Sequence, residues 1–172
     1  MLPTGIPTTI DQPETSLQAW REGWIVRQAS RSRHPPLFWR IVADRLVVER
    51  QQLHCAPTVP LGPTTLERPE VMSFLLQRYQ RAIGLELSGN SEALVLHEAN
   101  VADCYMGLSP YDRLLIIYTH RHWDQDALRV REAFVAQALK PDSNDTIYFR
   151  DHAERLAKRL GQSWSQGLVR IL

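Results

Sequence analysis

Two histidines and an aspartate follow one another at two-residue spacing, directly after an apolar run. His120, His122 and Asp124 come after the apolar stretch 114–118. Imidazole nitrogens and carboxylate oxygens are common ligands of zinc and related divalent metals. Two histidines at this spacing diverge on a helix, which turns about 100° per residue, but share one side of a strand. The segment therefore predicts a metal site only if its backbone is not helical.

The order of these residues is similar to the metal-binding signature Thr-His-x-His-x-Asp-His of metallo-β-lactamase-like hydrolases. Here it reads Thr119, His120, Arg121, His122, Trp123, Asp124 and Gln125. By that resemblance His120 and His122 would bind one zinc, and Asp124 would serve a second metal or the attacking water. Gln125 stands where the family has its next histidine. The resemblance implies a metal-dependent hydrolase with zinc or another divalent metal. The interpretation that we favour is a structural cluster without a cofactor.

Tryptophan and arginine gather in the N-terminal third of the chain, and both residue types are enriched at binding hot spots. The predicted contact surface comprises Trp20, Trp24, Arg31, Arg33, Trp39 and Arg40. From it we predict a non-catalytic protein-interaction module, acting on another protein as an assembly factor, adaptor or regulatory subunit. The alternative is a nucleic-acid or anion binder through the arginine-rich loop 27–40. Acids interleaved with these arginines, such as Glu22 and Asp44, favour an ion-paired surface instead.

His97 and Cys104 are a further pair of residues that could carry out chemistry. They are seven positions apart, so they share one face if residues 91–106 are helical. A thiol near an imidazole is the composition of a nucleophile. The alternative is that Cys104 fills apolar space, as buried cysteines commonly do.

Composition limits the class of protein. The 172 residues, 44% of them apolar, predict one domain at 17–172 behind a flexible N-terminal arm at 1–16. A net charge of +1 argues against general binding of polyanions. Two cysteines, no leader-like segment and no apolar run of roughly 18 residues predict a soluble, cytoplasmic protein without a membrane span. The oligomeric state is not determined by these features.

Apolar periodicity and helix-end residues predict a mainly α fold, a single compact multi-helix domain. Helices are expected over 16–28, 37–54, 64–84 (opened by Thr64, ended by Gly84), 91–106, from Ser109, from Asp124 or Asp126 to before Pro141, and from Asp151 to Gly161. For 37–54 the alternative is a hairpin. For the whole chain the alternative is an α+β fold, with a small sheet from 114–118, 146–149 and 168–172 packed on helices. The apolar residues of 164–172 are expected to dock on the fold.

Overall fold

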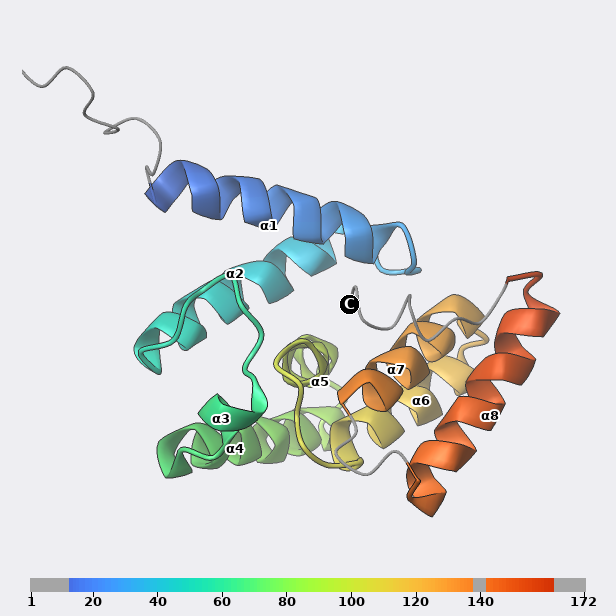
Figure 1. The fold of residues 1–172 in the computed structure, drawn as a ribbon. Helices are drawn as coiled ribbons and strands as arrows, with labels where there is room; N and C mark the ends of the chain where they lie inside the picture. The colour runs from blue at the N-terminus through green and yellow to red at the C-terminus, as the bar shows by residue number, and fades with distance from the viewer. Residues whose placement is uncertain (1–12, 138–141, 163–172) are drawn as a thin grey trace, which may run out of the picture.

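The computed structural model describes residues 13–137 and 142–162, which form eight helices and no strand (Figure 1). The helices are α1 (Pro13–Ala29), α2 (Pro36–Gln52), α3 (Pro63–Leu66), α4 (Pro69–Leu87), α5 (Glu92–Ala102), α6 (Ser109–His120), α7 (Asp124–Gln137) and α8 (Asn144–Arg159). The prediction of a mainly α fold is confirmed. The alternative sheet is wrong at 114–118 and 146–149, which lie in α6 and α8. Its third strand, 168–172, and the predicted docking of 164–172 lie outside the described residues.

Helix α5 is the centre of the fold, and Figure 1 shows it end-on among the other helices. It contacts α2, α4, α6 and α7. Every residue from Ala93 to Val101 is buried, although this segment includes His97, Glu98 and Asn100. A helix that is covered on all sides must find partners for such polar side chains within the protein.

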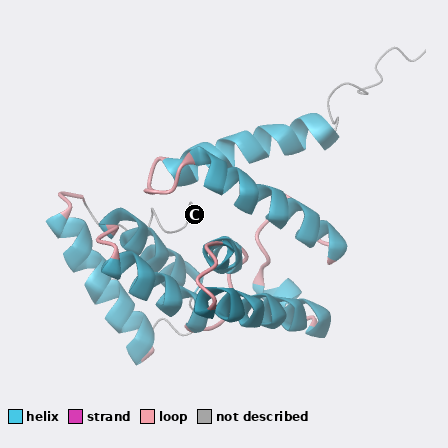
Figure 2. Ribbon diagram, turned by 180° about the vertical axis from the view of Figure 1, so that it is seen from behind, coloured by secondary structure: helices cyan, strands magenta, loops and turns pink. Residues whose placement is uncertain are grey.

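Helices α1 and α2 form a pair that Figures 1 and 2 both show lying side by side, on one side of α5. Ile25 of α1 packs with Trp39, Val42 and Leu46 of α2, and α5 adds Val95 to this cluster. The helical prediction for 37–54 is confirmed, because α2 is continuous across the alternative hairpin turn. Helix α1 begins at Pro13, so residues 13–16 of the predicted arm belong to it; residues 1–12 lie outside the described part.

Two further helix starts differ from those that the sequence predicted. Thr64 lies inside the short α3, and α4 begins separately at Pro69. Arg68 before this proline is extended (φ −70°, ψ 125°), as steric contact with a following proline requires. Helix α8 begins well before Asp151, because the Ser143 hydroxyl accepts the backbone N–H of Thr146 at 3.3 Å and caps the helix there.

Five helices end with the same backbone turn. After α2, α5 and α6 the residue in the left-handed conformation is His54, Cys104 or His122, and after α4 and α8 it is Gly89 or Gly161. In each case the next N–H bonds a carbonyl five residues earlier, as from Trp123 to Tyr118 at 2.8 Å. Helix α4 thus continues past Gly84, the predicted end, while Gly161 ends α8 as predicted.

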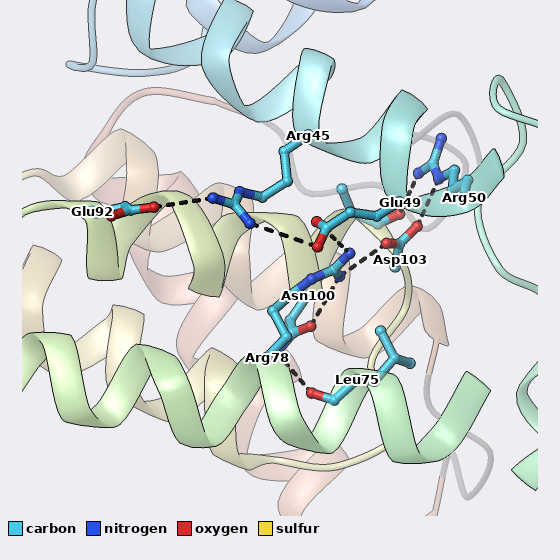
Figure 3. A network of polar contacts seen from close by, with 9 residues as sticks. Arg45, Glu49, Arg50, Leu75, Arg78, Glu92, Asn100 and Asp103 are labelled. Carbon is cyan, nitrogen blue, oxygen red and sulfur yellow. Dashed lines mark hydrogen bonds and ion pairs between the residues drawn. The ribbon is translucent and has the colours of Figure 1, made fainter. Parts of the chain in front are cut away.

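A buried network of charged side chains joins α2, α4 and the end of α5 (Figure 3). Asp103 accepts from Arg50 Nε at 2.7 Å and from Arg78 Nη1 at 3.0 Å. Arg78 also donates to Asn100 at 3.0 Å and to Glu49 at 3.1 Å. Both arginines and Asp103 are almost fully buried. One carboxylate therefore acts as the shared counter-charge of two buried guanidinium groups. It also fixes three helices to one another.

None of the helices in the described ranges combines the length and the apolar composition needed to cross a lipid bilayer.

We predict that Asp103→Ala lowers the free energy of unfolding by about 3–5 kcal/mol, because Arg50 and Arg78 then remain buried without their shared counter-charge. Urea unfolding followed by circular dichroism measures the change. The matched control is Asp44→Ala, which removes the exposed ion pair with Arg21 (2.6 Å) and should cost about 1 kcal/mol or less. Equal losses in the two variants would contradict the structural role of Asp103.

Candidate binding cleft

A cleft of about 430 Å³ lies between the α1–α2 pair and helices α5 and α7. Its walls come from all four helices and from Pro60 in the segment that joins α2 to α3. A volume of this size is typical of sites for small molecules or for a few side chains of a partner. We refer to it below as the tryptophan cleft, because Trp20, Trp24 and Trp39 all line it.

The three tryptophans form a continuous aromatic wall. Trp20 and Trp24 are one helical turn apart on α1 and stack with ring centroids 6.0 Å apart. Trp24 meets Trp39 of α2 edge to face at 5.8 Å. Trp20 and Trp24 are partly exposed, whereas Trp39 is only 1% exposed and belongs to the core. The three tryptophans of the predicted contact surface are therefore in contact with one another. Trp20 and Trp24 offer exposed surface, whereas Trp39 packs beneath them in the core.

The opposite wall, from α5 and α7, includes a buried ion pair between Glu98 and Arg129. Glu98 of α5 accepts two hydrogen bonds from Arg129 of α7, at 2.6 and 2.9 Å, and one from the Tyr118 hydroxyl at 2.5 Å. Arg129 also donates to Asp126 at 2.9 Å, and its guanidinium carbon lies 4.7 Å from the Trp39 ring centroid. Burial and the pairing of Tyr118 with Glu98 hold the pKa of the Tyr118 hydroxyl well above 10. The Tyr118 hydroxyl therefore stays neutral and the Arg129 guanidinium stays charged near neutral pH.

The loop between α1 and α2 is anchored to this same cluster. Asp126 accepts hydrogen bonds from the Ser32 hydroxyl at 2.6 Å and from the Arg33 backbone N–H at 2.8 Å. His34 Nε2 lies 2.9 Å from the Tyr118 hydroxyl. Tyr118 donates its only hydroxyl hydrogen to Glu98, so His34 must donate through Nε2. The loop thereby fixes the α1–α2 pair, and with it one wall of the cleft, to α5, α6 and α7.

The predicted arginines do not line the tryptophan cleft. Arg31 pairs with Glu132 at 2.5 Å, and Arg40 pairs with Glu22 at 3.0 Å. Arg33 is exposed and is held in the loop through its backbone N–H. Acids therefore neutralise part of the arginine-rich loop. The cleft is lined instead by Arg27, Arg50 and Arg129.

The residues His120, His122 and Asp124 lie at the junction of α6 and α7. His120 is the last residue of α6, His122 is the left-handed residue after it, and the Asp124 carboxylate pairs with Arg159 at 3.0 Å. Both histidines are exposed. Within the described ranges no group of three or more His, Cys, Asp or Glu side chains lies close enough together to hold a metal ion. The structure thus gives His122 a backbone role, ending a helix.

The pair His97 and Cys104 is also explained by packing. His97 is fully buried and bonds Glu86 through Nε2 at 3.1 Å. Cys104 is the left-handed residue after α5, and burial raises the pKa of its thiol. A raised pKa is the opposite of what a thiolate nucleophile needs.

Several cleft residues were not identified from the sequence, among them Arg50, Glu98 and Arg129, whereas Arg27 was included as the first residue of the arginine-rich loop 27–40. Glu98 had a signal: it is an acid inside the apolar run 93–101, where it must be buried and paired. Arg50 and Arg129 are buried in α2 and α7. Nothing in the sequence distinguishes them from the many other arginines of the chain. Their importance depends on the partners that the fold brings to them.

We predict that His122→Gly raises the free energy of unfolding by about 0.5–1 kcal/mol, because glycine adopts the left-handed conformation without the cost that a Cβ brings. Thermal and urea unfolding in the presence of a chelator measure the change. His120→Gly, inside the last turn of α6, is the control and should be destabilising. If added zinc instead stabilised the parent protein but not His122→Gly, the metal hypothesis would be restored.

Acid should destabilise the fold through its buried histidines. Burial lowers the pKa of His34 and of His97 below 6.5, although nearby Glu98 acts against this shift at both. Below about pH 6.5 the unfolded chain binds protons that the native fold does not, so the free energy of unfolding falls as pH falls, by up to about 1.4 kcal/mol per pH unit for each histidine. This decline ends once pH is below the folded-state pKa values.

Urea unfolding between about pH 7.5 and 5, a range that spans the ordinary histidine pKa, measures this slope. His34→Gln, which keeps a donor toward Tyr118 but cannot titrate, should reduce the slope. The exposed His120→Gln should leave it unchanged. An unchanged slope in His34→Gln would show that His34 is not the group responsible.

Comparison of the chain with protein-family models, with curated proteins and with solved structures gave no match. Its function must therefore be inferred from the contacts of the described residues.

Proposed function

We propose that this protein is a non-catalytic interaction protein that accepts an apolar segment of a partner protein in the tryptophan cleft. The observation that carries the proposal is the convergence of Trp20, Trp24 and Trp39 on one cleft of about 430 Å³. Tryptophans that are partly exposed beside a fixed wall have the composition and setting of binding hot spots. An assembly factor, adaptor or regulatory subunit would use such a cleft.

The cleft offers apolar area without needing to rearrange. Beside the indoles, Val101 and Ala102 of α5 and Ala133 and Ala136 of α7 line it. Covering such surface contributes about 25 cal/mol per Å² of apolar area removed from water. Because Trp39 is fixed in the core and packs against Arg129, the wall is already in place before a partner arrives. A preformed wall lowers the ordering cost that association must otherwise meet.

The pairing of the ionisable groups supports binding rather than catalysis. Glu98 is bonded by Arg129 and Tyr118, and Arg50 is bonded by Asp103. A general base needs a free lone pair within reach of a substrate and a pKa near the working pH. The oxygens of Glu98 and Asp103 already accept hydrogen bonds from several donors, which leaves few lone pairs free for a substrate. Their role in this proposal is to hold the four helices of the cleft in place.

The other functional classes draw less support from the contacts. A hydrolase at His120, His122 and Asp124 would need these side chains to converge, and Asp124 is engaged by Arg159. A nucleic-acid binder would need a free basic surface, and Arg31 and Arg40 are ion-paired. We therefore rank both below the cleft.

The test places a photo-crosslinking amino acid at position 24, in the full-length protein inside its native cells. A control position is Leu87 at the end of α4, which is 83% exposed and outside the cleft. We expect position 24, and not position 87, to crosslink a defined partner. Once that partner is purified, Trp24→Ala should weaken its binding by about 2 kcal/mol, or about 30-fold in Kd.

Two further variants separate contact from folding. Leu87→Ala should bind the partner as the parent protein does, since Leu87 is remote from the cleft. Trp39→Ala should instead lower stability by about 3–5 kcal/mol, because it leaves a cavity in the core. The proposal fails if Trp24→Ala, with unchanged circular dichroism, binds the partner as tightly as the parent protein.

A further inference from the structure

The lining of the tryptophan cleft carries more cationic than anionic side chains. Arg27, Arg50 and Arg129 line it, against Glu98 as the acidic residue of the lining. Arg50 is neutralised by Asp103, and Arg129 by Glu98 and Asp126. Arg27 differs from these two, because its side chain is exposed and the described residues supply no ion pair for it. An uncompensated positive charge thus remains beside the aromatic wall.

Arg27 is positioned to act together with the indoles. It lies one turn beyond Trp24 on α1, so Trp20, Trp24 and Arg27 follow one another along one side of the helix. Gly23 leaves room for the guanidinium: a Cβ at position 23 would lie 3.2 Å from Arg27 Nη1. The guanidinium therefore lies close to the helix surface at Gly23.

We infer that the occupant of the tryptophan cleft is an acidic, apolar segment of the partner, with a bulky apolar side chain against the indoles and a carboxylate toward Arg27. This inference rests on the proposed function and adds the chemistry of the partner to it. A carboxylate supplies a counter-charge for Arg27 and accepts hydrogen bonds from its guanidinium. A basic segment would be repelled by the positive charge of Arg27, and a purely apolar one would leave that charge without a counter-charge.

The experiment uses random heptapeptides displayed on phage, selected on the full-length protein after depletion on its Trp24→Ala variant. Depletion removes peptides that bind elsewhere. We expect the selected peptides to combine Asp or Glu with Leu, Ile, Phe or Trp. A synthetic copy of the best peptide should then lose affinity about tenfold or more when its acid is replaced by the amide, and similarly on Arg27→Glu. Isothermal titration calorimetry measures both losses.

The control is Arg81→Glu, an exposed arginine on α4 with the same change in net charge, which should keep the affinity of the parent protein. Selected peptides that lack acids, or an affinity that Arg27→Glu leaves unchanged, would overturn the acidic preference while the cleft remains a binding site. If selection yields no peptide that depends on Trp24, both this inference and the proposed function are wrong. The two failures are therefore distinguishable.

Discussion

The fold depends on the pairing of the polar side chains that α5 carries into the core. Glu98, Asn100 and Asp103 are buried on or just after a helix that four others cover. A buried charge without a counter-charge costs several kcal/mol, so each acid has arginine partners. Asp103 takes them from α2 and α4, and Glu98 takes its partner from α7. The pairs do more than neutralise charge: they fix how the neighbouring helices lie against α5.

The cleft is a consequence of that arrangement. The α1–α2 pair is attached to the remaining helices along α2, by apolar packing on α5 and by ion pairs such as Arg50–Asp103. It is also attached at the loop whose Ser32 and Arg33 bond Asp126. Between these attachments the tryptophans of α1 and α2 face α5 and α7 across a space that side chains leave open. A wall fixed at both ends keeps its shape without a ligand, which favours recognition by a preformed surface.

Several residues that the sequence suggested as reactive groups or metal ligands have a backbone role at helix ends instead. Cys104 and His122 occupy the position after a helix where glycine is the usual residue, and His54 does the same after α2. Histidine is among the residues enriched in this conformation, so its presence at a helix end has a local explanation. The spacing of His120 and His122 resembles a metal signature, but the intervening turn belongs to a helix end.

The sequence by itself determined where most of the helices lie. Apolar spacing and the absence of Gly and Pro over 37–54 predicted α2, and Gly161 predicted the end of α8, because these effects act within a few residues. The start of a helix was less predictable where more than one residue could cap it. Helix α8, for example, is capped by Ser143 and not by Asp151. Only the tertiary structure decided which arginine meets which acid, and therefore where the cleft lies. Pairs such as Arg31 with Glu132 are 101 residues apart in the chain, and no local pattern selects one partner among so many charged residues.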